Sequence, residues 1–387
     1  MVRDYEETAT AARARMVDQL RANGVSARTL AAFDSVPRHR LVPHFWSIPM
    51  TIGTRRTRTI EHREGDPTGL ALLHDIERAH AINQVAGAVG DTTSTASAPR
   101  LLAAQADLLD LHAGMTVLEI GTGPGYFAAI LSLLVGPEGR VYTVDIDGDV
   151  AALAAERLDA LGYTNVTVLA RDGHLGAPEP APFDRVVGSV GCNDIAAAWL
   201  DQLRSDGFAL IPLRHGCFHP MLRVEPDGRA RIVTRSGYVA IQGVQSDTTL
   251  WPYANASARA TARAPLPGEL AAALAAPAEL LRIGARTEWD LAYWIAITDQ
   301  RAGAMAELND GAGSSARIDT RAGAIRRGGP AGAALATELL DHAAAWLRAG
   351  RPRGEDYEQR FVPLGAADAG AGWVIHRVDH DQVLTLV

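Results

Sequence analysis

Hydrophobic runs and polar breaks alternate regularly between residues 99 and 212 of this 387-residue chain. Short apolar runs that alternate with helical periodicity are typical of a parallel sheet covered by helices. The pattern therefore predicts an α/β fold with a Rossmann-like core. The predicted strands are 116–120, 140–145, 165–169, 184–189 and 207–212, and the predicted helices are 100–111, 126–135, 149–161 and 194–204.

The segment before this core has a different pattern. Residues 4–45 are predicted to be helical with a break at 23–24, and residues 47–98 are predicted to be irregular. A long irregular stretch in an enzyme is more often a substrate lid than a simple connector. We therefore expect residues 1–98 to form an N-terminal helical segment and lid.

The segment after the core begins with a hairpin signal at Pro226-Asp227-Gly228. The later pattern predicts Ala-rich helices, a Gly-rich loop over 311–330, a helix over 331–347 and a strand pair over 373–387. We expect a core domain over 99–250 and an α+β C-terminal extension over 251–387.

The first predicted strand of the core runs into a glycine-rich turn. Glu119 lies near its end, and Gly121, Gly123 and Gly125 follow at alternate positions. Glycines let a backbone turn sharply and approach a ligand, and the next predicted helix presents its N-terminus at the same place. The segment predicts a pocket of nucleotide size; the alternative is a tight turn without a ligand.

A second acidic residue narrows the choice of cofactor. Asp145 ends the next predicted strand, about 20 residues further on, where a carboxylate can accept hydrogen bonds from both hydroxyls of a ribose. NAD and S-adenosylmethionine both fit that arrangement. The dinucleotide fingerprint is G-x-G-x-x-G, whereas this chain has G-x-G-x-G after Glu119. A carboxylate there repels a diphosphate and suits the ammonium of a methionine, so the pattern favours S-adenosylmethionine.

Composition excludes several classes of function. All 37 basic residues are arginines, so lysine Schiff-base, pyridoxal and P-loop chemistry are excluded. The net charge of -8 predicts no nucleic-acid partner, although arginines at 55–58 and 326–327 could meet an acidic surface.

Cys192 and Cys217 are too few for a disulfide framework or a cysteine zinc site. No apolar run reaches the ~20 residues of a membrane span. We expect a cytoplasmic protein, most simply a monomer, without a metal or a membrane partner.

Seven segments carry a recognisable wording along the chain: MVDQLRANG from Met16, VPRHRLVP from Val36, Ser97-Ala-Pro, LEIGTGPGY from Leu118, Arg171-Asp-Gly, Ala181-Pro-Phe-Asp and QLRSDGFALIP from Gln202. Together and in this order, from about residue 15 to residue 245, they resemble the protein-L-isoaspartate O-methyltransferase family. The resemblance implies a class I S-adenosylmethionine methyltransferase core with S-adenosylhomocysteine as product. Two departures, Gly188-Ser-Val-Gly-Cys in place of Thr-Ala-Ala and a longer loop before Ser97, imply altered substrate handling.

The resemblance also implies roles for individual residues. The glycines line the methionine side of the cofactor, Asp145 holds the ribose, and Asp172 with Gly173 meets the adenine. Ser97 matches the active-site serine, with the alternative that it caps the helix that follows. The implied cofactor set is Glu119, Gly121, Thr122, Gly123, Gly125, Tyr126, Asp145, Ile146, Asp172 and Gly173, and the implied substrate set is Ser94, Thr95, Arg38 and Gly191. For Arg38 the alternative is a structural residue of a Pro-bounded turn.

The long C-terminal extension resembles family members that act on ribosomally made peptides. Those relatives methylate an aspartate side chain, and the ester then collapses to an aspartimide or isoaspartate. A carboxylate is already ionised at pH 7, so orientation and desolvation would drive the transfer without a general base. The resemblance therefore implies a peptide substrate carrying Asp or isoAsp, most simply a macrocyclised one. The alternatives are repair of isoaspartate in damaged proteins and a non-catalytic peptide-binding protein on the same fold.

Overall fold

The computed structural model describes residues 2–47, 60–83, 93–216, 218–246, 251–252, 260–275, 287–303, 306–320, 322–368 and 372–387. The chain divides into two compact units and passes between them several times: the first contains 1–190, 198–210 and 238–244, and the second contains 191–197, 211–237 and 245–387. In the described part of the chain, no helix is long and apolar enough to cross a bilayer. The arginines at 55–58 and Cys217 lie outside the described residues.

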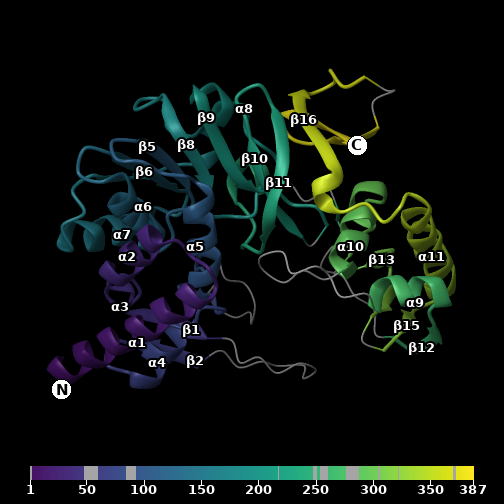
Figure 1. Ribbon diagram of the computed structural model, residues 1–387, viewed down its shortest axis with the longest axis horizontal. Coiled ribbons are helices and arrows are strands. Elements are labelled where there is room, and N and C mark those ends of the chain that lie inside the picture. The colour runs from purple at the N-terminus through teal and green to yellow at the C-terminus, as the bar shows by residue number, and fades with distance from the viewer. Residues whose placement is uncertain are drawn as a thin grey trace. The chain divides into compact units, whose positions relative to one another are not determined.

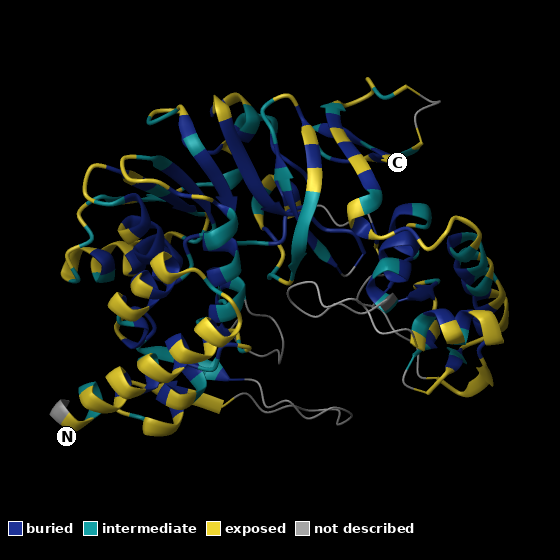
Figure 2. Cartoon of the chain, viewed as in Figure 1, coloured by how far each residue is buried: buried dark blue, intermediate teal, exposed yellow. Residues whose placement is uncertain are grey.

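Helices open the first unit, as the sequence predicted. They are α1 (Val2–Ala22), α2 (Ala27–Ser35) and α3 (Arg38–Leu41). In α1 the buried positions Ala9, Ala12, Met16 and Leu20 recur every three or four residues, so one face packs inward and the other carries exposed residues (Figure 2). Ser26 begins α2 by accepting a hydrogen bond from the Thr29 backbone N–H.

The next segment forms a small antiparallel sheet where the sequence predicted irregular structure. Its four strands have the order β2-β1-β3-β4. A short helix, α4 (Pro67–Leu73), begins at the N-cap Asp66. The strands are only two to four residues long, too short to give a recognisable alternation. They are β1 (His44–Ser47), β2 (Ile60–Arg63), β3 (His80–Ala81) and β4 (Thr95–Ala96).

A parallel sheet forms the centre of the first unit (Figure 1), which confirms the predicted α/β class. Strand β5 (Thr116–Ile120) pairs with β6 (Arg140–Asp145) on one side and with β8 (Phe183–Gly188) on the other. Outside these lie β7 (Val166–Ala170) and β9 (Leu203–Pro212). The strand order reverses between β5 and β8, and ligands of open α/β sheets bind at such a reversal.

The helices of this core are α5 (Pro99–Leu108), α6 (Tyr126–Val135), α7 (Gly148–Ala160) and α8 (Ala197–Asp201). All residues of α6 except Leu133 are buried, which is why its sequence is apolar on every face. Helix α8 is shorter than the predicted 194–204, because residues 203–206 belong to the long strand β9.

The second unit contains antiparallel strands in the order β10-β11-β16-β18-β17. The predicted hairpin is β10 (His219–Val224) with β11 (Arg229–Ser236), and the predicted terminal pair is β17 (Trp373–His376) with β18 (His380–Leu386). Strand β16 (Tyr357–Pro363), which the sequence pattern did not reveal, joins the two pairs.

A further sheet with the order β12-β15-β14-β13 lies in the same unit. The predicted Gly-rich loop over 311–330 is wrong, since it contains β14 (Ser315–Asp319) and β15 (Ala324–Gly328). Helix α11 (Gly332–Arg348) was predicted almost to the residue, and its Leu339 and Trp346 are fully buried in the apolar core. The other elements are β12 (Ala262–Pro265), β13 (Glu307–Asn309), α9 (Gly268–Ala275) and α10 (Thr287–Thr298).

Candidate active site

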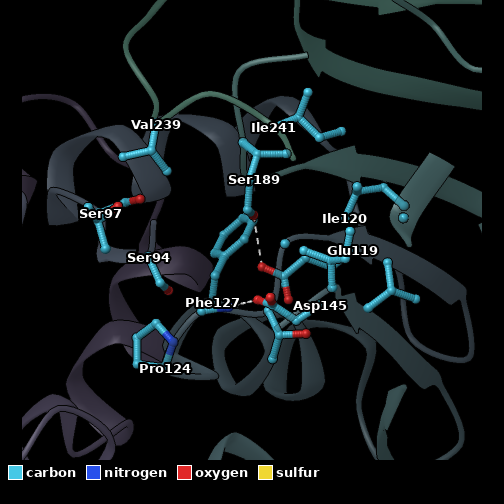
Figure 3. Close-up of a pocket in the computed structure, with 18 of the residues that line it drawn as sticks. Ser94, Ser97, Glu119, Ile120, Pro124, Phe127, Asp145, Ser189, Val239 and Ile241 are labelled. Atoms are coloured by element: carbon cyan, nitrogen blue, oxygen red, sulfur yellow. Dashed lines mark hydrogen bonds between the residues drawn. The ribbon is translucent and has the colours of Figure 1, made fainter. Parts of the chain in front are cut away.

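A cavity opens in the first unit at the carboxyl ends of β5, β6 and β8 (Figure 3). It lies where the strand order reverses, as expected for a ligand site of this fold. Four stretches that are distant in sequence supply most of the wall. The lining residues are 93–97, Leu102, 119–124, Tyr126, Phe127, 144–146, Gly173, Ser189, Val190 and 239–242.

The glycine turn after β5 has the conformation that its sequence requires. Gly121, Gly123 and Gly125 have φ angles of 96°, 50° and 81°, in the left-handed region that glycine adopts at little cost. A Cβ at Gly121 would lie 2.7 Å from Val190 Cγ1, and one at Gly123 would lie 3.3 Å from the Thr95 carbonyl oxygen. At Gly121 and Gly123 the turn therefore presents bare backbone to the cavity, where a side chain would fill the space. Gly125 is not among the residues that line the cavity, and a Cβ there would lie 3.0 Å from Leu158 Cδ1.

Glu119 is a fully buried carboxyl group in the cavity wall. The hydroxyls of Thr143 and Ser189 each donate a 2.8 Å hydrogen bond to one of its two oxygens. Burial raises the pKa of Glu119 to about 8, and the two hydroxyls only partly offset that effect. The site therefore favours the neutral carboxyl group when it is empty, and a cationic ligand beside Glu119 would stabilise its ionised form by supplying a counter-charge.

Asp145 ends β6 and also lines the cavity. One carboxylate oxygen accepts the Gly123 N–H at 2.9 Å and the other accepts the Asp147 N–H at 3.1 Å. Burial is the largest cause of a raised pKa at Asp145, and the two backbone donors act against it. The group joins the glycine turn to the end of the neighbouring strand and offers acceptors to a ligand with hydroxyl donors.

Most of the remaining members of the predicted cofactor set line the same cavity. Thr122, Tyr126, Ile146 and Gly173 all line the cavity. Asp172 does not line it; its carboxylate instead accepts the backbone N–H groups of His174 at 2.9 Å and of Val244 at 2.9 Å. Its predicted contact with an adenine stays a prediction.

The predicted acceptor residues line the opposite side of the cavity from the carboxyl groups. Figure 3 shows Ser94 and Ser97 on one side of the view and Glu119 and Asp145 on the other, and Thr95 also lines the wall. The alternative role of Ser97 as a helix cap is not observed, because Ala98 is the N-cap of α5 and no side chain caps this helix.

Two of the predicted substrate residues lie away from the cavity surface. Arg38 is fully buried and donates hydrogen bonds to the carbonyl oxygens of Leu73 at 3.0 Å and Ser97 at 2.7 Å. It therefore contacts the backbone of the serine rather than the cavity. Gly191 belongs to the second unit, where an added Cβ would lie 2.3 Å from His219 Nε2. Neither residue is among those that line the cavity.

One stretch of the wall was missed by sequence reasoning. Residues 239–242 line the cavity, and Val239 lies beside Ser97 in Figure 3. Tyr238 Oη donates a 2.5 Å hydrogen bond to Gln105, whose side chain donates to the Gly188 carbonyl at 2.7 Å. No motif marks this stretch. Its one sequence signal is an apolar run, Tyr238-Val-Ala-Ile, between polar segments.

The fold and this site define a class I S-adenosylmethionine-dependent methyltransferase. A family profile described as Protein-L-isoaspartate(D-aspartate) O-methyltransferase (PCMT) matches residues 76–242. A protein-L-isoaspartate O-methyltransferase of Methanococcoides burtonii is 31% identical over 221 residues, which are 57% of this chain and 93% of that relative. One of Ignicoccus hospitalis is 45% identical over 119 residues, 31% of this chain and 56% of the relative, so the chain matches just over half of that protein.

A solved structure of a protein-L-isoaspartate O-methyltransferase superimposes with a TM-score of 0.51 at 20% identity, covering 90% of this chain and 95% of that one. This likeness concerns the fold. The sequence matches establish the family. The chain belongs to the protein-L-isoaspartate O-methyltransferase family, whose members are S-adenosylmethionine-dependent carboxyl methyltransferases.

Proposed function

We propose that this protein uses S-adenosylmethionine to methylate the free carboxylate of isoaspartyl residues in damaged proteins and peptides. One observation carries the proposal. A single cavity places Ser97 opposite the glycine turn and the carboxyl groups of Glu119 and Asp145. The family relatives named for this reaction support the choice of acceptor.

The cavity residues fit the cofactor in chemical terms. Glycine at Gly121 and Gly123 keeps the turn free of side chains. Asp145 would accept hydrogen bonds from ribose hydroxyls, and Glu119 would hold a cationic ammonium. When bound, S-adenosylmethionine supplies a methyl group on a sulfonium, which is an electrophile.

The protein's part in the transfer is to orient the acceptor and exclude water. An isoaspartyl carboxylate is ionised at neutral pH, so none of the residues needs to act as a general base. The Ser97 hydroxyl would donate a hydrogen bond to one carboxylate oxygen and leave the other directed at the methyl group. Phe127, Val239 and Ile241 in the wall would keep water from the nucleophile (Figure 3).

The more specialised hypothesis, methylation of an aspartate in a ribosomally made peptide, depended on the C-terminal extension. The superposition on a protein-L-isoaspartate O-methyltransferase covers 90% of this chain, so it includes much of residues 251–387. An extension of this kind is therefore not by itself a mark of a specialised peptide substrate. Repair is the simpler proposal, and the two differ in an easily measured specificity.

The test uses the full chain, S-adenosylmethionine with a labelled methyl group, and peptides that differ at one position. Three linear peptides carry L-isoaspartate, L-aspartate or asparagine, and a fourth is a macrocyclic peptide with L-aspartate. We expect label to enter only the isoaspartyl peptide, in several sequence contexts. Label in the macrocycle but not in the isoaspartyl peptides would contradict repair and support the specialised hypothesis. Failure to bind the cofactor would support a non-catalytic peptide-binding role.

A further inference from the structure

Arg38 is an arginine with no exposed surface, although it lies in the four-residue helix α3 near the N-terminus. Burial of a guanidinium is costly unless its charge and donors are satisfied. Within the described residues, no carboxylate forms an ion pair with it. Two of its nitrogens instead donate to backbone carbonyl oxygens, Nε to Leu73 at 3.0 Å and Nη2 to Ser97 at 2.7 Å, while Nη1 has no hydrogen-bond acceptor among the described residues.

The flat face of the same guanidinium covers a second residue of the cavity wall. Arg38 Cζ lies 4.4 Å from the centroid of the Tyr126 ring. Tyr126 is the first residue of α6 and directly follows Gly125, the last glycine of the turn. A cation over an aromatic face is attracted by the ring, and more strongly where water is excluded. One side chain thus contacts the acceptor side of the cavity through Ser97 and the cofactor side through Tyr126.

We propose that Arg38 is a positioning residue that sets the distance between the acceptor serine and the cofactor turn. This inference rests on the proposed function, since it concerns the alignment of acceptor and methyl group. Group transfer is sensitive to alignment, and a misplacement of about 1 Å can lower the rate on the order of 100-fold. A guanidinium suits the task because its planar shape lets it donate at the edge and stack on its face, which an ammonium cannot do.

A direct contact between Arg38 and the substrate is the competing interpretation. It conflicts with the complete burial of the side chain and with its absence from the cavity lining. A purely structural brace is the other interpretation. Kinetics separate all three roles: loss of a substrate contact raises KM, loss of alignment lowers kcat, and loss of a structural brace changes neither in a variant that folds.

The experiment compares Arg38→Met and Arg38→Lys with the wild type and with Arg40→Met. Arg40 lies in the same helix but is half exposed and pairs with Glu6 at 2.8 Å, so it is a matched control. Each protein is assayed for methylation of the isoaspartyl peptide, for S-adenosylmethionine affinity by calorimetry, and for thermal unfolding. We expect Arg38→Met to lower kcat about 10- to 100-fold with cofactor affinity changed less than about 3-fold, and Arg38→Lys to restore little of kcat.

Other outcomes would overturn the inference in distinct ways. A higher KM with unchanged kcat would make Arg38 a substrate contact. Unchanged kcat and KM in a folded variant, or failure of both variants to fold, would make it a structural residue alone. Inactive wild-type protein would refute the proposed function itself, and with it this inference. Arg40→Met should resemble the wild type throughout.

Discussion

Among the single residues of the cavity wall, Glu119 combines complete burial with an ionisable carboxyl group. Its folded-state pKa of about 8 lies above the ordinary value of 4.5, because burial disfavours the ionised form. The neutral carboxyl group is therefore favoured in the folded protein without a ligand. Folded-state stability should fall as the pH rises from about 4.5 towards 8, because the unfolded chain loses this proton first.

The first prediction concerns this carboxyl group. Glu119→Gln keeps the shape of the side chain but removes the charge that would meet the cofactor's ammonium. We expect S-adenosylmethionine to bind about 10-fold or more weakly, since a hydrogen bond to a charged group contributes about 1.5–3 kcal/mol. In the wild type, affinity measured by calorimetry should rise as the pH rises towards about 8, because a growing fraction of Glu119 is then ionised before the ligand binds. The variant should lose this rise, and a rise of equal size in Glu119→Gln would refute the assignment.

The second prediction concerns Asp145. Asp145→Ala should weaken S-adenosylmethionine binding by about 1–3 kcal/mol, the range for leaving buried polar partners unpaired. Asp149→Ala, an exposed acidic residue in the following helix, is the control and should bind normally. Equal affinities for both variants in calorimetry would contradict the ribose assignment.

The third prediction concerns Ser97. Ser97→Ala should lower methyl transfer about 10- to 100-fold, because a hydrogen bond to a charged acceptor contributes about 1.5–3 kcal/mol. Cofactor affinity should stay within a factor of about two, since the hydroxyl is proposed to meet only the acceptor. Ser35→Ala, on the exposed face of α2, should match the wild type in both assays. Loss of cofactor binding in Ser97→Ala would instead make the serine structural.

Sequence alone predicted those pocket residues whose chemical type already indicates their role. Three alternating glycines, an acidic residue before them and another at the next strand end identify a cofactor pocket without any structure. Residues 239–242 have no such mark, because apolar wall residues resemble ordinary core. The contact between Arg38 and the Ser97 backbone could not be predicted from the sequence either, since 59 residues separate the two and only the fold brings them together.

At the level of elements, a hydrogen-bonded chain ties the small sheet of the first unit to α4. Ser47 Oγ lies 2.8 Å from His62 Nε2, and His62 Nδ1 lies 2.6 Å from Asp66 Oδ2. The other Asp66 oxygen caps α4 by accepting the Thr68 N–H at 2.9 Å. One carboxylate thus begins a helix and fixes a strand residue. Ser47 and His62 are almost completely buried, as suits a structural link.

The fourth prediction follows from this link. Asp66→Ala should lower the free energy of unfolding by about 0.5–2 kcal/mol, the usual cost of losing an N-cap. Asp66→Asn, which keeps a cap, should lose less. The hydrogen bond from His62 is the largest cause of a lowered pKa at Asp66. The Asp66 carboxylate therefore contributes fully to the free energy of unfolding above its ordinary pKa of 3.8. This contribution is lost as the pH falls through the lower pKa that Asp66 has in the folded protein. Urea unfolding of both variants at pH 7 and pH 3 would check this, and equal losses at both pH values would contradict it.

Strongly patterned elements were predicted well and weakly patterned ones were not. Strand β5 and helices α6 and α11 have clear hydrophobic patterns with clear ends, and their bounds agree with the prediction to within a residue. Strands β14 and β15 lie in a stretch rich in glycine and arginine, where pairing across the sheet outweighs weak local preference.

At the level of the whole molecule, the two units are interleaved along the chain. The second unit takes residues 191–197 and 211–237 from within the predicted core segment. Strand β11 pairs with β16, which lies more than 120 residues further on, through Arg229 and Arg360. The functional division into residues 1–98, 99–250 and 251–387 stays a prediction. Sequence pattern cannot reveal such interleaving, because it reports local periodicity and not the partner of each strand.

The fifth prediction tests whether the units are independent. Truncation near residue 250 is unsuitable, since it would remove α10, α11 and β16 and leave β11 with an unpaired edge. Trp346→Ala removes the largest buried side chain of α11 and should destabilise the second unit by about 3–5 kcal/mol. We expect scanning calorimetry to show a lower midpoint temperature for the transition of the second unit only. The affinity for S-adenosylmethionine at 25 °C should be unchanged. A parallel loss of cofactor binding would show that the units unfold together.

The return of the chain to the first unit over residues 238–244 also bears on protein synthesis. Residues 239–242 line the cavity, so a nascent chain on the ribosome cannot complete its binding pocket until they have emerged. By then β10 and β11 have also been made, while β16, the partner of β11, has not. Translation therefore exposes an unpaired strand edge during the same interval in which the pocket first becomes complete, and a cofactor bound at that stage would stabilise the finished unit while the rest is still being made.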